Sequence, residues 1–270
     1  MIRHRRLKLA ILTAFHGRHK LARLWLRHFS MLRHRLAGEV DLHIFATVSP
    51  TDFHDAAQFR NDLAAAGIAW QVHANNPVSY KWQAGVYAVR TGWPEVEAVT
   101  FFGSDDFPSI GYLRLVAAKL AEGKSAAFGP DRIHFLDAVS GRMLVWQGPH
   151  FTNIGNMPPG AGRTFSRAAL DALDWRLWTE AKDRGLDISA FKTMHAAGVG
   201  LDTVAIRSHP ESIILDVKIP GTNIHSYAAF HAFPEISPVA AVAACHRIGV
   251  EHSEFLAVAA AELATAKEKQ

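Results

Sequence analysis

Short apolar runs alternate with amphipathic helical patterns through the first half of this 270-residue chain, and this alternation restricts the fold more than any other feature. Two apolar runs, Leu7–Phe15 and Val40–Val48, are predicted strands. Between them, His19–Leu36 places leucines and aromatic residues at helical spacing. The same order continues with a helix at 53–66, a strand at 69–73, a helix at 79–91 and a strand at 99–102. Such a rhythm is typical of βαβ units and predicts a mostly parallel sheet.

The second half of the sequence adds shorter elements to this α/β core. We expect a helix at 108–122, short strands at 125–128, 133–137 and 143–146, and a long Gly-, Pro- and Asn-rich loop at 148–162. A helical stretch at 166–184 and a strand at 204–207 follow, and the alanine-rich tail at 238–270 is predicted as one amphipathic helix that packs back on the domain. No repeat or low-complexity linker interrupts the chain, so residues 1–270 are predicted to form a single domain.

Composition excludes several classes of protein. The single cysteine, Cys245, excludes an internal disulfide framework and a multi-cysteine zinc site, which favours a reducing cytoplasm. No run approaches the roughly 18 uncharged apolar residues of a membrane span. The N-terminal "MIRHRRLKLAILTAFHG" mimics a signal peptide, but its apolar run is short and fits a first core strand better. We therefore expect a soluble, cytoplasmic protein without membrane insertion and without an evident obligate protein partner.

Two adjacent carboxylates follow a predicted buried strand in "VTFFGSDDFPSIGY". Ligands of open parallel sheets bind just beyond the carboxyl ends of the strands, where Asp105 and Asp106 lie. Paired carboxylates repel one another unless a cation or hydrogen-bond donors compensate them, and Mg²⁺ or Mn²⁺ is a natural compensator. The alternative is a helix N-cap, which Asp106 would fit. The pair alone does not decide between these two interpretations.

Neighbouring motifs favour the metal interpretation. They read "NPVSYKW" before the fourth strand, then "GSDD", "GAGRTFSR", "WRLW" and "GLD" along the chain. In this order they resemble the motifs of small GT-A-type glycosyltransferases, similar to family 2 enzymes and especially to compact versions found in phages. The resemblance spans about residues 9–230, and its specificity lies in the order of the motifs. It implies a GT-A-like, Rossmann-related fold and a metal-dependent enzyme of the hexosyltransferase type that uses a nucleoside-diphosphate sugar.

The resemblance also assigns roles to residues of this sequence. It implies Asp106 as the metal ligand for Mn²⁺ or Mg²⁺, and Asp187 as the general base that takes the proton of the acceptor hydroxyl. Asp202, in a second Gly-Leu-Asp, competes for that role. The residues implied in binding the nucleotide sugar are Thr13, Ala14, Phe15, Arg18, Asn76, Lys81, Asp105 and Arg163.

A cluster of polar residues near the C-terminal end offers a further metal ligand. Asp216, Lys218, Asn223 and His225 gather after an apolar run, and His225 is the candidate that completes the metal shell, with His231 behind it. Lys218 is a candidate phosphate ligand. Trp175 and Trp178 share one helix face and are expected mainly in the core, whereas Trp146 is expected to reach a cleft.

The resemblance therefore implies an inverting glycosyltransferase, with a UDP-sugar favoured as donor. A 5-hydroxymethylpyrimidine in DNA is the favoured acceptor, because it would suit a basic enzyme of phage type, and a surface glycan or small metabolite is the alternative. The net charge of +4 attracts phosphates but does not choose between them. A non-catalytic module that binds nucleotide sugars is the alternative from another class, and a nucleotidyltransferase is a third that lacks the expected glycine-rich phosphate loop.

Overall fold

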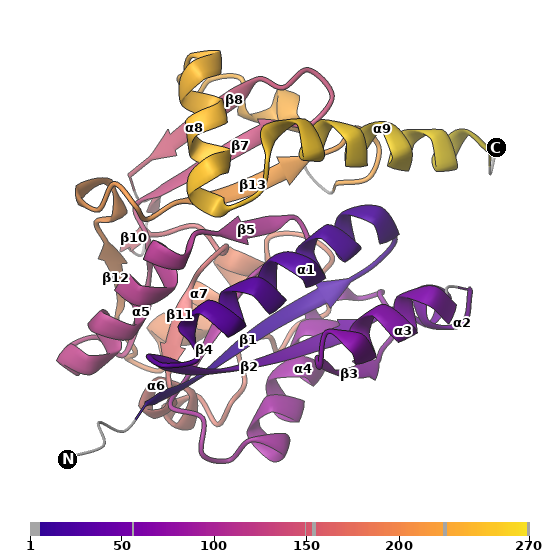
Figure 1. The fold of residues 1–270 in the computed structure, drawn as a ribbon. Coiled ribbons are helices and arrows are strands. Elements are labelled where there is room, and N and C mark those ends of the chain that lie inside the picture. The colour runs from indigo at the N-terminus through magenta and orange to yellow at the C-terminus, as the bar shows by residue number, and fades with distance from the viewer. Residues whose placement is uncertain (1–5, 56, 149, 153–154, 224–225, 269–270) are drawn as a thin grey trace.

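Two β-sheets lie one above the other in the structure, a computed structural model that describes residues 6–55, 57–148, 150–152, 155–223 and 226–268 (Figure 1). The larger sheet has seven strands and the smaller has four, and a separate two-stranded hairpin joins β9 (His150–Thr152) to β10 (Gly155–Met157). Within the described part of the chain, no helix is both long and apolar enough to cross a membrane.

The seven-stranded sheet is mostly parallel, as predicted. All neighbouring strands run parallel except β11, which is antiparallel to both of its neighbours. In spatial order the strands are β12 (Leu201–Val204), β6 (Ala127–Pro130), β11 (Thr164–Ser166), β4 (Ala98–Phe101), β1 (Leu7–Phe15), β2 (Val40–Val48) and β3 (Ala69–Val72).

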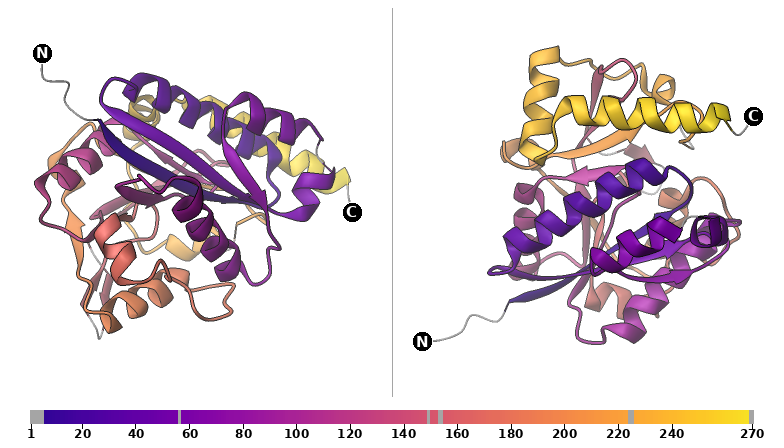
Figure 2. Two further views of the ribbon diagram at one scale, coloured as in Figure 1. Left: turned by 90° about the horizontal axis from the view of Figure 1, so that it is seen from below. Right: turned by 45° about the vertical axis from the view of Figure 1, so that its right-hand side comes forward.

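Helices cover both faces of this sheet (Figures 1 and 2). The α-helices of the described residues, not all of which pack on this sheet, are α1 (His19–Leu36), α2 (Pro50–Asp55), α3 (Ala57–Ala65), α4 (Val78–Gly92), α5 (Ile110–Glu122), α6 (Arg167–Ala172), α7 (Leu186–Ala196), α8 (Pro238–Ile248) and α9 (His252–Glu268).

The alternation of side chains along β1 divides the core into two layers. Leu9 and Ile11 face the layer that contains the apolar stripe of α1, whereas Ala10 and Leu12 face the layer that contains α4. Helix α4 approaches β1 closely at Gly85, where a Cβ atom would lie 2.7 Å from Leu12 Cδ1. Both faces of β1 are therefore buried, which explains its unbroken apolar run.

The smaller sheet joins segments that lie far apart in the sequence. Its strands, in spatial order, are β5 (Asp106–Pro108), β13 (Ile214–Lys218), β7 (Arg132–Asp137) and β8 (Met143–Gln147). Strand β5 follows directly from β4 and the Gly-Ser-Asp-Asp turn, so the chain passes from one sheet to the other at the paired aspartates. Helices α8 and α9 pack beside this smaller sheet (Figure 1).

Four predicted helices differ from the observed ones. The helix expected at 108–122 begins at Ile110, because Ser109 is its N-cap and accepts a hydrogen bond from Tyr112 N. The stretch at 166–184 is helical only to Ala172, and the backbone then adopts positive φ at Asp174 and Trp175, which an α-helix does not accommodate.

The C-terminal tail forms two helices, where one was predicted. Helix α8 ends at Gly249, whose φ of +87° lies in the left-handed region that glycine adopts at helix C-termini. Helix α9 then runs back along α1, and Glu262 Oε1 accepts hydrogen bonds from the backbone amides of Lys20 and Leu21. The segment at 53–66 likewise lies in two helices, and the strand expected at 204–207 ends at Val204.

Candidate functional site

A cavity of about 490 Å³ lies where the two sheets meet. Residues that follow the carboxyl ends of β1 and β4 line one side, among them His16, Arg18, Ser104 and Asp105, while the smaller sheet contributes Asp216. The carboxyl ends of parallel strands are the common ligand-binding edge of α/β sheets. The paired aspartates therefore lie where the sequence predicted them, beyond a strand end, and they line a cavity.

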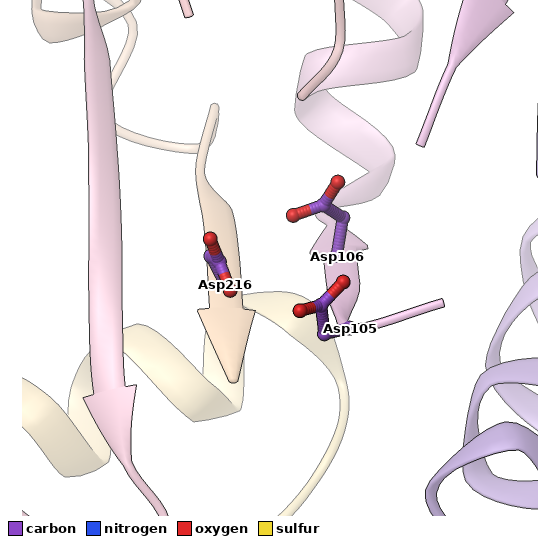
Figure 3. A group of neighbouring side chains, drawn as sticks. All are labelled: Asp105, Asp106 and Asp216. Atoms are coloured by element: carbon purple, nitrogen blue, oxygen red, sulfur yellow. The ribbon is translucent and has the colours of Figure 1, made fainter. Parts of the chain in front are cut away.

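Three carboxylates converge in this cavity (Figure 3). Asp105, Asp106 and Asp216 each offer an oxygen atom that lies within 4.8 Å of the other two. Antiparallel pairing of β5 with β13 places Asp216 opposite Asp106, and Val217 N donates a hydrogen bond of 2.9 Å to Asp105 O. Because like charges directly opposite one another destabilise a sheet, this arrangement needs compensation.

Two cations and an amide compensate part of this charge. Asp105 Oδ2 accepts hydrogen bonds from Arg18 Nη1 at 3.1 Å and from Asn223 Nδ2 at 2.6 Å. Lys218 Nζ lies 2.7 Å from Asp216 Oδ1 and 3.7 Å from Asp105 Oδ2. Three carboxylates thus face two cationic side chains, and the cluster keeps one negative charge if all three are ionised.

The pKa values of the three carboxyl groups separate accordingly. Burial raises the pKa of Asp105, but Arg18 and Lys218 outweigh burial and bring that pKa to about 2. Burial raises the pKa of Asp106 well above its usual range, and the charges of Asp216 and Asp105 raise it further. Burial also raises the pKa of Asp216 to about 6, against the opposing effect of Lys218. Asp106 is therefore the carboxyl group that most needs a further positive charge.

The oxygen ligands of this cluster fit a divalent cation. Mg²⁺ and Mn²⁺ prefer carboxylate oxygens, and a divalent cation would favour the ionised form of Asp106. Of the two histidines predicted nearby, His225 lies outside the described residues. His231 is exposed, and its Nδ1 donates a hydrogen bond of 2.7 Å to Ala228 O. The cluster gains Asp216 as its third acidic residue.

Arg18 reaches the cluster because the backbone before α1 takes an unusual path. Gly17 and Arg18 have φ values of 62° and 52°, and for Arg18 this left-handed conformation is uncommon. The turn directs the guanidinium of Arg18 toward the Gly-Ser-Asp-Asp segment, where Nη2 donates a hydrogen bond of 2.7 Å to Ser104 Oγ. Strained residues concentrate at binding sites, where the surrounding structure holds them in place.

The structure separates the other residues predicted to bind the nucleotide. Ala14 lines the cavity, but Thr13 and Phe15 are fully buried and point away from it. Asn76 is exposed, and its neighbour Asn75 lines the cavity in its place. The alternation of side chains along β1 explains why only one of three consecutive residues reaches the cavity.

Lys81 lies beneath the cavity and is fully buried. Its Nζ donates hydrogen bonds to Phe15 O, to Ser49 Oγ at 2.6 Å and to Asn75 Oδ1 at 3.1 Å. Burial lowers the pKa of Lys81 to about 8. The side chain thus ties the ends of β1 and β2 to the loop that precedes α4, and it acts on the cavity through Asn75.

The glycine-rich loop and α7 form another side of the cavity. Arg163 is buried, and its Nη1 and Nη2 donate hydrogen bonds to Asp187 O at 3.1 Å and to Pro158 O at 2.5 Å. The exposed Asp187 carboxylate lines the cavity and accepts a hydrogen bond of 3.2 Å from Gly160 N. A Cβ atom at Gly160 would lie 2.1 Å from Asp187 Oδ1, so this close approach requires glycine.

The remaining candidates divide between the cavity and the core. Asp202 lies on edge strand β12, where its Oδ2 accepts a hydrogen bond of 2.5 Å from Ser125 Oγ, and it does not line the cavity. Trp175 is fully buried, as expected. The expectation for Trp146 was wrong: its side chain is buried in the core and does not line this cavity. Trp178, expected mainly in the core, contributes to the cavity lining.

Comparison with known proteins defines the class of fold. No protein-family model matches the sequence, and no curated protein matches it. Among solved structures, S. aureus TarS 1-349 is 14% identical with a TM-score of 0.50, and the match covers 74% of this chain and 58% of that one. S. aureus TarS is 12% identical with a TM-score of 0.51, and the match covers 79% of this chain and 37% of TarS. S. aureus TarS 1-349 in complex with UDP-GlcNAc is 12% identical with a TM-score of 0.50, and the match covers 95% of this chain and 72% of that one.

These matches show the fold: the mostly parallel sheet flanked by helices is of the GT-A type, so the predicted GT-A-like fold is confirmed. The chain spans 58% of the length of TarS 1-349 in the first match and 37% of TarS in the second.

Sequence reasoning placed Asp216 and Lys218 in a polar cluster but missed the role of each: Asp216 received none, and Lys218 was a candidate phosphate ligand. Asp216 is a third carboxylate of the cluster, and Lys218 is its counter-ion. The available signal was the alternation in "ILDVK", which places Asp216 and Lys218 on one face of a strand, but nothing in the sequence specifies that this strand pairs with the aspartate segment.

Proposed function

We propose that this protein is a nucleotide-sugar-dependent glycosyltransferase that transfers a sugar from a nucleoside-diphosphate sugar to an acceptor hydroxyl. The observation that carries the proposal is the buried cluster of Asp105, Asp106 and Asp216 at the strand ends of a GT-A-type fold. A UDP-sugar is the favoured donor, because a structural neighbour was solved in complex with UDP-GlcNAc.

The donor would occupy the polar half of the cavity. Asp106, Asp105 and Asp216 would hold Mn²⁺ or Mg²⁺, which supplies charge neutralisation for a departing diphosphate. Arg18 and Lys218 supply fixed positive charge beside the cluster, so both favour the diphosphate in its leaving state. Ala14, His16 and Asn75 border the region that would receive the nucleoside.

Asp187 is the proposed general base, and the proposed stereochemical outcome is inversion. Its carboxylate is exposed to the cavity, and the adjacent Arg163 guanidinium is fixed by two backbone carbonyls. A base at this place takes the acceptor proton as the new glycosidic bond forms. Asp202 lacks that access because it lies outside the cavity lining.

Two acceptors are proposed, the same two as from the sequence: a hydroxymethylated pyrimidine in DNA, and a glycan or small metabolite. Described cationic residues of the cavity lining are committed to partners within the protein, Arg18 and Lys218 to carboxylates and Arg163 to carbonyls. A duplex acceptor therefore requires phosphate contacts from residues beyond the cavity. A module that only binds nucleotide sugars is the alternative in which Asp187 has no catalytic role.

Transfer and hydrolysis assays test this proposal. UDP-sugars would be screened with Mn²⁺, with and without acceptors, for the wild type, Asp106→Asn and Asp187→Asn. We expect Asp106→Asn to lose donor turnover and Asp187→Asn to lose transfer at least a hundredfold. Glu122→Gln is a matched control, because it removes a surface carboxylate whose ion pair among the described residues is an exposed i,i+3 contact with Lys119. Donor binding without turnover under any acceptor would support the binding module.

A further inference from the structure

One side of the cavity is aromatic. Trp82, Phe101, Phe165 and Trp178 all line it, and we call these four residues the aromatic wall. Phe101 is its centre, with ring centroids at 5.4 Å from Phe165, 5.6 Å from Trp178 and 6.0 Å from Trp82. The four rings come from four separate segments of the chain, so the fold brings together a surface that no single sequence motif encodes.

The wall is held rigidly beside the proposed base. Trp178 Nε1 donates a hydrogen bond of 3.0 Å to Leu186 O, the residue before Asp187. Gln83 Oε1 accepts hydrogen bonds from the backbone amides of Leu177 and Trp178 at 2.9 and 3.0 Å. These contacts fix the Trp178 ring relative to the Asp187 carboxylate, and a fixed ring loses little conformational entropy when it binds a ligand.

The surroundings of the wall contain few groups that form hydrogen bonds. Val78, Leu186 and Ala190 complete the lining on this side. Nη1 and Nη2 of Arg163 donate to backbone carbonyls and its Nε is buried, so this guanidinium offers no accessible donor, and Asp187 is the carboxylate on this side of the cavity. A polyhydroxylated ring would leave several of its hydroxyl groups without partners here, which costs affinity. A flat ring with one hydroxyl arm matches both the aromatic surface and the single acceptor carboxylate.

Exposed charges near the wall are balanced. Between α6 and α7, Arg176 pairs with Asp174 at 3.4 Å, and Lys182 pairs with Glu180 at 2.8 Å. These two pairs therefore carry no net positive charge. A ligand on this side of the cavity would be bound mainly by contact with the faces of the aromatic rings.

We propose that the aromatic wall is the acceptor subsite, and that its ligand is a planar heteroaromatic ring that carries a hydroxymethyl group. The ring stacks on Trp82, whose side chain is half-buried, and the hydroxyl points to Asp187. This inference rests on the proposed function. Such a ring is available as a free nucleoside or as a base extruded from a nucleic acid strand, and both present the same chemistry.

The transfer step balances with the residues present. The hydroxymethyl oxygen forms a bond to the anomeric carbon of the donor sugar, and its proton passes to the Asp187 carboxylate. The bond between the anomeric carbon and the diphosphate oxygen breaks, and its electron pair leaves with the diphosphate. No oxidant, reductant or other co-reactant is needed.

Calorimetric titration measures the proposed binding directly. The wild-type protein with UDP and Mn²⁺ would be titrated with 5-hydroxymethyl-2′-deoxyuridine, and separately with a methyl hexopyranoside. We expect the nucleoside to bind at least tenfold more tightly than the hexoside. Because a stacked aromatic side chain contributes strongly to base binding, we expect Trp82→Leu to weaken nucleoside binding about tenfold or more. Trp93→Leu is the matched control. Trp93 is the C-cap of α4, the helix that contains Trp82, but its ring packs on His43 and Phe45, outside the cavity.

The outcomes separate this inference from the proposed function. If wild-type protein binds or hydrolyses no UDP-sugar, the proposed function fails. If it turns over the donor but binds the hexoside as tightly as the nucleoside, or if Trp82→Leu and Trp93→Leu weaken nucleoside binding equally, the aromatic subsite is refuted. Transfer to the free nucleoside, to a single-stranded oligonucleotide and to a duplex that carries the same base then identifies the source of the ring.

Discussion

Lys218 provides the sharpest quantitative test of the carboxylate cluster. Its ammonium lies 2.7 Å from Asp216 and 3.7 Å from Asp105, and its side chain is only 8% exposed. Lys218→Met keeps the length and apolar character of the side chain but removes the charge. Because removing one member of a buried ion pair leaves an uncompensated charge, we expect a loss of about 3 kcal/mol in the free energy of unfolding. For a chain of this size that corresponds to about 6–12 °C in Tm.

Mn²⁺ should reverse this loss. A ligand that binds only the folded state adds about 2.7 kcal/mol at a hundred times its Kd. Without the competing ammonium the cluster attracts a divalent cation more strongly, so we expect Mn²⁺ to raise the Tm of Lys218→Met by more than it raises that of the wild type.

Thermal unfolding with EDTA and with Mn²⁺ measures both effects. Lys119→Met is the control, because that lysine forms an exposed pair on α5 that contributes little. A Lys218→Met protein with wild-type Tm in EDTA, or with an equal or smaller shift in Mn²⁺, would refute the proposed competition between ammonium and metal.

Three further changes test other parts of the structure. Burial lowers the pKa of His28 from its ordinary 6.5 to about 4. The unfolded chain therefore binds a proton that the folded protein does not, and stability falls as pH drops from 6.5 toward 4, by up to about 3 kcal/mol; denaturant titrations should show a shallower pH dependence in His28→Gln. Gly160→Ala would place a Cβ 2.1 Å from Asp187 Oδ1 and displace the carboxylate, so we expect the transfer rate to fall at least tenfold in steady-state assays. Lys81→Met removes the hydrogen bonds from the buried ammonium to Phe15 O, Ser49 Oγ and Asn75 Oδ1, and urea denaturation should show a loss of about 2–4 kcal/mol, whereas an unchanged midpoint would contradict that role.

The first half of the fold follows from local sequence patterns. Strand β1, helix α1 and strand β2 have the predicted bounds. The two strands are unbroken apolar runs, and the helix has its apolar residues at helical spacing. The predicted bounds are wrong where tertiary contacts override the local sequence pattern. The helix predicted through Trp175 ends early because residues after Ala172 take positive φ, and side-chain hydrogen bonds from Gln83 hold the chain that follows.

The site was predictable only where its residues are adjacent in sequence. Asp105 and Asp106 stand together after a buried strand, and Asp187 follows a glycine-rich loop. Asp216 joins them through the register of β13 on β5, a pairing across more than a hundred residues that no local pattern encodes. The buried position of Lys81 has the same origin, because it depends on how α4 packs beneath the ends of two strands.

Metal-dependent nucleotide binding by the three carboxylates is the central claim, and calorimetric titration of UDP tests it most directly. Asp216→Asn removes one charge from the cluster while it preserves the shape of the side chain. We predict that wild-type protein binds UDP in the presence of Mn²⁺ but not in EDTA, and that Asp216→Asn weakens the Mn²⁺-dependent binding at least tenfold. Equal UDP affinity in Mn²⁺ and EDTA, or unchanged affinity in Asp216→Asn, would contradict the account.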